Sequence, residues 1–398
     1  MSLFTAVEMA PRDPILGLNE QFAADTNPNK VNLGVGVYFD DNGKLPLLKC
    51  VQAAEQAMMK APTARGYLPI DGIVAYDNAV KTLVFGAGSE PLAAGRVATV
   101  QALGGTGGLK VGADFLKKLS TNAKVLISDP SWENHRALFT QAGFLVESYP
   151  YYDAASRGID FDGMLAALNG AAAGTIVVLH ACCHNPTGYD ITSDQWDQVV
   201  EAVKAKKLTP FLDMAYQGFG YGIEEDGAAI GKFVQAGLTF FVSTSFSKSF
   251  SLYGERVGAL SVLCESKDEA ARVLSQLKIM VRTNYSNPPI HGGAVVAAVL
   301  SDPQLRAQWE EELTEMRVRI KAMRQKLVDG LKAAGVKEDM NFITQQIGMF
   351  SYSGLAKAQM HRLRDEFGVY GTDTGRMCVA ALNSKNIAYV CDAVAKVI

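Results

Sequence analysis

Residues suited to chemistry occur directly after short apolar runs between residues 98 and 264. Five such points are residues 104–108 (GGTGG) after ATVQAL, 130–132 (PSW) after KVLISD, 184–188 (HNPTG) after TIVVLHACC, 213–216 (DMAY) after PFL, and 246–248 (FSK) after FFVSTS. If the runs are parallel strands, their carboxyl ends meet at one edge of a sheet, where ligands bind in open α/β folds. The sequence therefore predicts one crevice formed by these five loops.

Lys248 is the candidate nucleophile. It lies in the apolar segment FVSTSFSKSFSLYGERVG, whose only other positive charge is Arg256. Apolar surroundings would lower the pKa of the lysine and make its amine reactive toward an aldehyde. The hydroxyls of Ser245 and Ser247, together with Arg256, could hold a phosphate dianion. The alternative is an ordinary solvated lysine at the end of a strand.

Asp213 follows the apolar residues PFL, so its carboxylate is expected to be buried. An unpaired buried carboxylate is costly, and Asp213 therefore needs a cationic partner. A protonated pyridine nitrogen would be one, and pyridoxal chemistry combines such an aspartate with a lysine Schiff base. A structural ion pair is the alternative.

The glycine run at residues 104–108 matches no nucleotide-binding motif. Thr106 and Lys110 stand where G-x-G-x-x-G requires glycines, and no G-K-[ST] follows to make a P-loop. The run could still place backbone N–H groups at the start of a helix over 107–119, where the helix dipole favours a phosphate. A simple strand-to-helix turn is the alternative.

No metal site is expected at residues 180–184, although His180, Cys182, Cys183 and His184 lie close together in the sequence. Side chains alternate along a strand, and no second pair of ligands lies elsewhere in the chain. We interpret these four residues as buried strand residues beside a functional loop.

The elements that must position these residues alternate between strand and helix. Helix-patterned stretches at 108–119 and 193–207 separate the apolar runs, which predicts an α/β fold with a largely parallel sheet covered on both faces. From Pro303 the apolar spacing predicts one long helix, with Gly330 and Gly335 near its end. Residues 336–398 are expected to form a smaller α+β unit that the N-terminal segment joins. The predicted division is a large domain at 46–303 and a small domain made of 1–45 and 304–398.

The bulk properties favour an ordinary intracellular enzyme. A chain of 398 residues, 48% of them hydrophobic, is long enough to bury two hydrophobic cores. Its formal net charge of -3 gives no sign of the excess positive charge that nucleic-acid binding requires. The first residues lack a signal peptide, and no apolar run is long enough to span a membrane. The sequence predicts a cytoplasmic protein without membrane or nucleic-acid partners, whose six cysteines are reduced and mostly buried.

Taken together, the motifs resemble those of the class I aminotransferases, in particular the bacterial aspartate and aromatic amino acid aminotransferases. The similar segments occur in the family's order from about residue 11 to the end: NLGVGVY, GGTGGLKVGADF, DPSWENH, HACCHNPTG, DMAYQGF, SFSKSFSLYGERVG, RTNYSNPP and GRMCVA. The resemblance implies the fold type I of enzymes dependent on pyridoxal 5'-phosphate. In that fold a mostly parallel seven-stranded sheet, flanked by helices, forms a large domain beside a smaller α+β domain.

The resemblance also implies roles for single residues. Lys248 would hold the cofactor as a Schiff base and move a proton between the substrate carbon and C4′. Asp213 would keep the ring nitrogen protonated. Asn185 and Tyr216 would bind the phenolic oxygen, and Trp132 would stack on the ring. The residues expected to bind the phosphate are Gly105, Thr106, Ser245, Ser247, Arg256 and, from the neighbouring subunit, Tyr67.

Two arginines would select the substrate. Arg376 matches the family arginine that binds the α-carboxylate in a bidentate manner. Arg282 matches the arginine that reaches across a homodimer to the distal carboxylate of aspartate, glutamate or 2-oxoglutarate. Gly36 lies in a segment that resembles the loop closing over bound substrate, and Asn185 would also contact the substrate.

The choice of amino donor is less directly encoded. Phe39 and Leu45 are apolar where aspartate-selective relatives tend to have polar residues, whereas Val37, Thr106 and Asn287 resemble the aspartate branch and Gly66 resembles neither. We expect transfer from tyrosine, phenylalanine or aspartate to 2-oxoglutarate, with an aspartate-selective enzyme as the alternative.

Two other classes of function remain possible on the same fold. A decarboxylase or lyase would keep the cofactor but change the reaction, so the two arginines carry the case for transamination. A transcriptional regulator would need an attached DNA-binding module, for which residues 1–40 have neither the length nor the basic charge.

Overall fold

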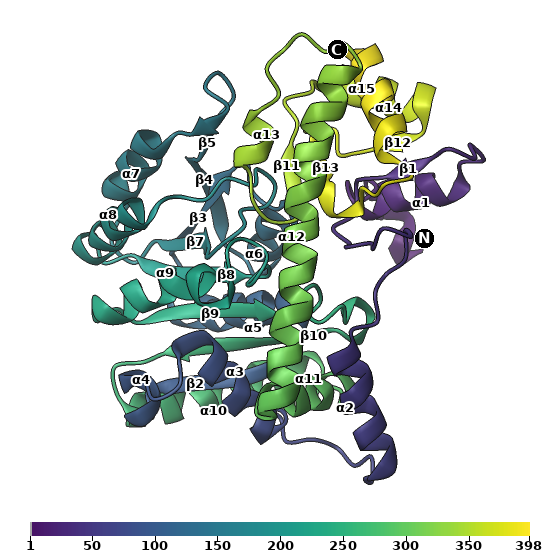
Figure 1. The fold of residues 1–398 in the computed structure, drawn as a ribbon. Coiled ribbons are helices and arrows are strands. Elements are labelled where there is room, and N and C mark those ends of the chain that lie inside the picture. Colours follow the sequence, from purple (N-terminus) through teal and green to yellow (C-terminus); the bar gives the residue numbers. More distant parts are fainter. Residues whose placement is uncertain (1) are drawn as a thin grey trace.

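Seven strands form the central sheet of the computed structural model, which describes residues 2–398 (Figure 1). Their order is β2-β10-β9-β8-β7-β3-β4. Their bounds are Val97–Leu103 (β2), Lys124–Asp129 (β3), Leu145–Pro150 (β4), Ile176–His180 (β7), Thr209–Met214 (β8), Phe240–Ser245 (β9) and Val257–Leu263 (β10). The neighbours from β9 to β4 pair in parallel, and β10 is antiparallel to both β9 and β2. The predicted, mostly parallel sheet is confirmed.

Both faces of this sheet are buried, which is why its strands have continuous apolar runs. In β3, Val125 and Ile127 enter one hydrophobic core and Leu126 enters the other. The first core contains residues of α5 (Gly104–Leu119), α6 (Glu133–Gln141) and α10 (Lys267–Asn284). The second contains residues of α2 (Lys49–Lys60), α3 (Val74–Phe85), α7 (Phe161–Gly170), α8 (Ser193–Ala205), α9 (Ile223–Gln235) and α11 (His291–Ser301).

The sheet contains one strand that the apolar runs did not predict, β4. It lies at an edge, and Val146 and Tyr149 are buried while Leu145, Glu147 and Ser148 are exposed. An edge strand needs no continuous apolar run, so this strand has no strong signal in the sequence.

The long helix α12 runs from Pro303 to Ala333, as the apolar spacing predicts. The Asp302 side chain caps it by accepting from the backbone N–H groups of Gln304 and Leu305. One part of α12 packs against α2 and α11, and another packs against α13 (Phe342–Gln345) and α15 (Ile387–Val397). Figure 1 shows α12 crossing the molecule from the region around α11 to the region around α15.

The C-terminal elements form small sheets and pack with the N-terminal segment. They are β11 (Phe350–Tyr352), α14 (Lys357–Phe367), β12 (Val369–Tyr370), β13 (Arg376–Cys378) and α15. Strand β11 pairs with β13, and β1 (Val31–Asn32) pairs in parallel with β12. The remaining elements are α1 (Leu16–Ala24), α4 (Glu90–Ala93), and the two strands β5 (Tyr152–Asp153) and β6 (Gly158–Ile159), which pair with each other.

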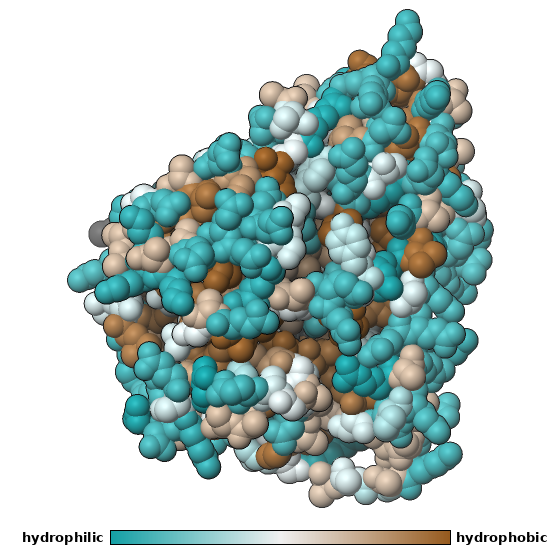
Figure 2. Space-filling model, turned by 60° about the vertical axis from the view of Figure 1, so that its left-hand side comes forward, coloured by the Kyte–Doolittle hydropathy of each residue, from teal (hydrophilic) through white to brown (hydrophobic). Residues whose placement is uncertain are grey.

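The surface in Figure 2 is mainly hydrophilic, with smaller groups of hydrophobic side chains between the polar ones. Among residues 2–398, no helix combines the length and the hydrophobicity needed to cross a bilayer. All six cysteines are buried, which confirms the expected burial, and their reduced state stays a prediction.

Candidate active site

A cavity of about 250 Å³ opens at the carboxyl edge of the sheet and is lined by residues from all five predicted loops. Twelve residues singled out from the sequence line it: Gly36, Gly105, Thr106, Trp132, Asn185, Asp213, Tyr216, Ser245, Ser247, Lys248, Arg256 and Arg376. Arg256 reaches the same edge because β10 is antiparallel, so the residue before that strand lies where the other strands end. Two other lining residues were considered in the sequence for other reasons, Val37 for donor specificity and His180 for a metal site. The sequence did not point to Ile15, Val35, Leu109, Ala215, Tyr253 and Phe350.

Lys248 follows β9 in a short loop that α12 holds in place. Trp309 of α12 donates from Nε1 to the carbonyl of Ser249 at 2.7 Å, and its ring stacks on Phe250 at 4.8 Å. The Nζ atom of Lys248 lies 4.7 Å from the centroid of the Tyr216 ring. Burial lowers the pKa of Lys248 to about 8, although the nearby carboxylate of Asp213 acts in the opposite direction. A larger fraction of this amine is therefore neutral near pH 8 than of an exposed lysine.

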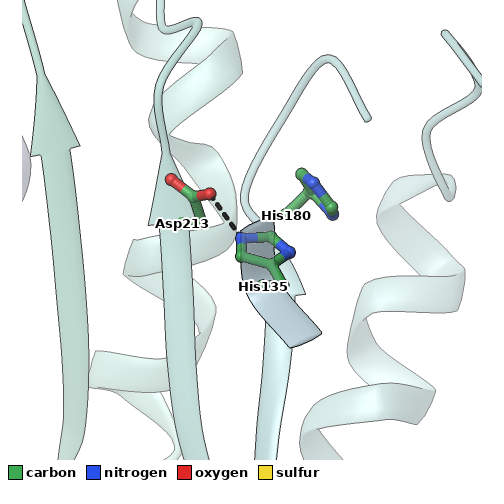
Figure 3. Close-up of side chains that lie close together, drawn as sticks. All are labelled: His135, His180 and Asp213. Atoms are coloured by element: carbon green, nitrogen blue, oxygen red, sulfur yellow. Dashed lines mark hydrogen bonds and ion pairs between the residues drawn. The ribbon is translucent and has the colours of Figure 1, made fainter. Parts of the chain in front are cut away.

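Asp213 is the penultimate residue of strand β8 and is 5% exposed. Its Oδ2 atom lies 2.8 Å from Nε2 of His135 (Figure 3). The Nδ1 atom of that ring lies 2.9 Å from the hydroxyl of Ser131. Burial raises the pKa of Asp213, but the hydrogen bond from His135, together with nearby basic side chains that include Lys248, outweighs burial and holds the pKa below its ordinary value. Asp213 is thus held as a carboxylate facing the cavity.

His135 is a functional residue that the sequence analysis missed. It follows the PSW loop by three residues and lies on α6, so no sequence pattern connects it to Asp213. The need of a buried carboxylate for a hydrogen-bond partner was visible in the sequence, but five histidines were available to supply it. Only the packing of α6 against the end of β8 decides which one does.

Among residues 2–398, two groups of buried or half-buried side chains come close enough to be considered as metal ligands. One is His135, His180 and Asp213, and the other is Cys182, Cys183 and Asp226. Burial lowers the pKa of His180 to about 3, which leaves the ring neutral. The Asp226 carboxylate already accepts hydrogen bonds from three backbone N–H groups, which leaves it little capacity for an ion. The expectation that no metal is bound stays a prediction.

The donors expected around a phosphate lie together beside the start of α5. The N–H of Gly104 donates to the carbonyl of Arg256 at 3.0 Å, but no side chain caps that helix, so the N–H groups that follow can face a ligand. The Arg256 guanidinium lies 3.3 Å from the hydroxyl of Ser247, and the N–H of Ser247 donates to Ser245 Oγ at 3.3 Å. Hydroxyls, a guanidinium and helix N–H groups make a donor set that suits a dianionic phosphate.

The glycine run is part of α5, which begins at Gly104 rather than at the predicted 107. A Cβ atom at Gly108 would lie 2.6 Å from Ser243 Oγ and 2.8 Å from the carbonyl oxygen of Ala259. Glycine at this position therefore lets the first turns of the helix pack directly on β9 and β10. The same glycines thus form the junction between strand and helix and the start of the helix that is expected to face a phosphate.

Arg376 has the contacts of a carboxylate-binding arginine. It is 1% exposed, donates from Nη1 to Asn185 Oδ1 at 2.9 Å and from Nη2 to the carbonyl of Gly34 at 2.7 Å, and stacks over the ring of Phe350. Among residues 2–398, its Nε atom is buried without a hydrogen-bond partner. An unpaired buried donor is costly, and a bound carboxylate would satisfy it.

Comparison with known proteins identifies the family. A family model described as aminotransferase class I and II matches residues 28–394. The chain belongs to this aminotransferase family. The resemblance noted from its motifs is confirmed.

Three relatives illustrate how similar the aminotransferase is to proteins of known name. The aspartate aminotransferase of Pseudomonas aeruginosa is 63% identical over 398 residues, with 100% of both chains covered. The aromatic-amino-acid aminotransferase of Escherichia coli is 52% identical over 99% of this chain and 100% of its own. A crystal structure of the aromatic-amino-acid aminotransferase from Burkholderia pseudomallei, covalently bound to pyridoxal phosphate, superposes with a TM-score of 0.97, at 67% identity and with 100% of both chains covered.

Two residues predicted for the site of this aminotransferase lie outside the cavity. Tyr67 is 96% exposed, and Arg282 is an exposed residue of α10 whose guanidinium contacts Ser286. Neither lines the cavity of its own chain. This placement is what the sequence expectation requires if both act on the site of a neighbouring subunit.

The residues considered for donor specificity are mostly absent from the cavity wall. Phe39 is half-buried, Leu45 is 41% exposed and Gly66 is exposed, and none of the three lines the cavity. Val37 and Thr106 do line it, while Asn287 does not. The apolar wall instead includes Ile15, which lies next to the start of α1, far from the other lining residues in sequence.

Proposed function

We propose that this aminotransferase binds pyridoxal 5'-phosphate at the described cavity and transfers the amino group of tyrosine, phenylalanine or aspartate to 2-oxoglutarate. The observation that carries the proposal is the presence in one cavity of the Lys248 amine, with its lowered pKa, and the buried Asp213 carboxylate. The name of the 67% identical relative, which binds pyridoxal phosphate covalently, supports the same cofactor.

The cavity residues fit each part of the cofactor. The donor set beside α5 would hold the phosphate, Trp132 would cover the ring, and Tyr216 and the Nδ2 amide of Asn185 would donate to the phenolic oxygen. Asn185 Oδ1 is occupied by Arg376, which leaves its amide nitrogen as the free donor. Burial raises the pKa of Tyr216, so its hydroxyl keeps the proton that it would donate.

Proton movement is assigned to Lys248 and Asp213. When bound, the cofactor supplies an electron sink that makes the α-proton of an amino acid acidic. The neutral amine of Lys248 would take this proton and return it at C4′, a role that suits it because burial leaves a larger fraction of the amine unprotonated than in an exposed lysine. Asp213 stabilises a proton on the ring nitrogen, because His135 holds the carboxylate in its charged form.

Arg376 binds the α-carboxylate and orients the α-carbon toward Lys248. Bidentate binding by a planar guanidinium fixes the orientation as well as the affinity. Gly36 lines the cavity next to the Phe350 ring on which Arg376 stacks, since a Cβ atom at Gly36 would lie only 2.7 Å from that ring. The segment around Gly36 would close over bound substrate, as its resemblance to the family's loop implies. Closure excludes water and strengthens the arginine contacts.

The active unit is a homodimer in which Tyr67 reaches the partner's phosphate and Arg282 binds the distal carboxylate in the partner's site. Their exposure on the isolated chain supports this assignment. We divide each chain into a large domain at 46–303 and a small domain formed by 1–45 and 304–398, a division supported by the pairing of β1 with β12. The cytoplasmic location stays a prediction of the sequence.

An aspartate-selective enzyme is the second candidate, because the 63% identical relative is named an aspartate aminotransferase. Catalytic efficiency for aspartate, tyrosine and phenylalanine with 2-oxoglutarate distinguishes the two. Comparable efficiencies for the three donors would support an enzyme that uses both aromatic amino acids and aspartate. Poor use of tyrosine and phenylalanine would support an aspartate-selective enzyme instead. Parallel double-reciprocal plots are expected for transamination in two half-reactions, and intersecting plots would contradict it.

A further inference from the structure

Gln101 is a buried residue of β2 that hydrogen-bonds two distant segments of the chain. It is 1% exposed. Its Oε1 accepts from the backbone N–H of Ile73 at 3.2 Å, and its Nε2 donates to the carbonyl of Pro289 at 2.9 Å. The backbone of Gln101 bonds the same two segments. Its N–H donates to the carbonyl of Asp71 at 2.8 Å, and its carbonyl accepts from the hydroxyl of Tyr285 at 3.1 Å.

Two glycines form the walls around this side chain. A Cβ atom at Gly72, whose φ is +110°, would overlap Cβ of Gln101, and a Cβ atom at Gly293 would overlap its amide nitrogen. The side chain is therefore confined to a slot that admits one orientation. With one acceptor facing an N–H group and one donor facing a carbonyl, an amide satisfies both segments at once.

The two segments are those that carry Tyr67 and Arg282. Tyr67 precedes Ile73 by six residues, and the turn closed by the hydrogen bond from Gly72 N–H to the Pro69 carbonyl lies between them. Arg282 lies in the last turn of α10, which Tyr285 ends as its C-cap residue.

A direct ion pair also joins the two segments. Asp71, in the turn after Tyr67, lies 3.0 Å from Nζ of Lys278, one helical turn before Arg282. Gln101 and this ion pair thus hold residues 71–73, which follow Tyr67, against residues 278–289, which include Arg282.

We propose that Gln101 is a positioning residue that fixes Tyr67 and Arg282 relative to each other, so that both reach the partner subunit's site together. The inference rests on the proposed function, in which these two residues act across the homodimer. Gln101 itself touches neither substrate nor cofactor, since it does not line the cavity. Loss of its amide should weaken cofactor and dicarboxylate binding at once.

The test compares three variants of the holoenzyme. Gln101→Met removes both side-chain hydrogen bonds at similar volume. Tyr285→Phe removes the hydrogen bond from the Tyr285 hydroxyl to the Gln101 carbonyl, on the Arg282 side, and leaves both side-chain hydrogen bonds of Gln101 in place. Thr99→Val is the matched control, because Thr99 is buried two residues earlier in β2 and bonds Ser261 of β10 instead of either segment.

Gln101→Met is expected to raise the Kd for pyridoxal 5'-phosphate and to lower kcat/KM for aspartate and 2-oxoglutarate about ten-fold, since small misplacements of binding groups are costly. The loss for tyrosine, which has no distal carboxylate, should be smaller. Tyr285→Phe should affect the dicarboxylates and leave the cofactor Kd unchanged. Thr99→Val should change neither property. Adding Arg282→Ala to Gln101→Met should cost less than the two changes separately, because the amide acts through that arginine.

The outcomes separate this inference from the proposed function. If Arg282→Ala leaves dicarboxylate kinetics unchanged, the cross-subunit role of Arg282 is wrong. If Arg282→Ala is damaging but Gln101→Met matches Thr99→Val, only the positioning role is wrong. Sedimentation and thermal unfolding show whether Gln101→Met remains a folded dimer. If it does not, Tyr285→Phe decides, and equal losses for aspartate and tyrosine in that variant would overturn the inference.

Discussion

The acid end of the cavity, around Asp213, and the carboxylate end, around Arg376, differ in how their buried polar atoms are satisfied. Asp213 is part of a chain of hydrogen bonds through His135 to Ser131, all within the large sheet and its covering helix. Arg376 donates two hydrogen bonds to the protein but keeps Nε buried and unpaired among the described residues.

The difference follows from what each end must hold. The group that faces Asp213 is expected to stay through every turnover, so its counter-charge can be fixed permanently by the fold. The carboxylate that faces Arg376 must enter and leave, so a donor has to remain available for it. A preorganised charge and an unsatisfied donor are therefore two solutions to binding, one for a resident group and one for an exchanging group.

The largest effect is expected where the two ends meet, at Lys248. Replacing it with alanine removes the one lysine among the described residues that line the cavity. This change should lower kcat by about 10⁴-fold or more, at the upper end of what a proton-transferring group contributes. The visible absorption of the bound cofactor should shift as well. Steady-state kinetics and absorption spectra measure both, with Lys118→Ala at the exposed end of α5 as control. Retained turnover would remove Lys248 from the mechanism.

Asp213→Asn tests the acid end. An amide keeps the shape but cannot hold a proton on a ring nitrogen, so kcat should fall by about 10³-fold while KM for the amino donor changes little. If Asp213 serves the resident cofactor and Arg376 the exchanging substrate, a change at Asp213 should affect kcat and not KM. A variant that mainly raised KM would show that Asp213 serves substrate binding instead.

Arg376→Ala tests the carboxylate end and should have the opposite signature. Losing charge-assisted hydrogen bonds of about 1.5–3 kcal/mol each should lower kcat/KM by about 10²–10³-fold, chiefly through KM. Arg376→Lys should recover little, because an ammonium cannot reproduce the planar fork. Equal losses for amino acids and for amines without a carboxylate would contradict the assignment.

The lowered pKa of Lys248 predicts a pH dependence for cofactor binding to the cofactor-free protein. Only the neutral amine attacks an aldehyde, so with a pKa of about 8 the rate of reconstitution should rise about ten-fold between pH 7 and pH 9. Because the pKa of the folded protein lies below that of the unfolded chain, stability should also rise with pH across this window. A rate that keeps rising toward pH 10.5 would indicate a solvated lysine.

The smallest effect is expected for His135→Asn, which weakens the support behind Asp213. Without the imidazole, the pKa of Asp213 should rise, since the hydrogen bond from His135 is the largest of the effects that lower it. The acidic limb of the pH profile of kcat/KM should then move to higher pH, with about a two- to ten-fold loss at neutral pH. His361→Asn changes a half-exposed histidine paired with Asp373 and serves as control. An unchanged acidic limb would mean that Asp213 does not depend on His135.

Much of the fold was predictable because its strands carry a strong local signal. Six of the seven strands of the main sheet and the helix from Pro303 follow from apolar runs and spacing. Strand β4 did not, because this edge strand buries only Val146 and Tyr149 and therefore has no apolar run. The start of α5 was placed three residues late, because glycines normally weaken a helix and here they allow it to pack directly on the sheet.

The sequence by itself determined which residues could do the chemistry, because a lysine, an aspartate and a phosphate-binding set each follow an apolar run that ends at one edge of a parallel sheet. Only the tertiary structure decided which side chains support them. His135 behind Asp213, Ile15 in the cavity wall and Gln101 between two loops are brought there by elements distant in sequence. Contacts of that kind depend on how helices and strands pack, and no local spacing of residues encodes them.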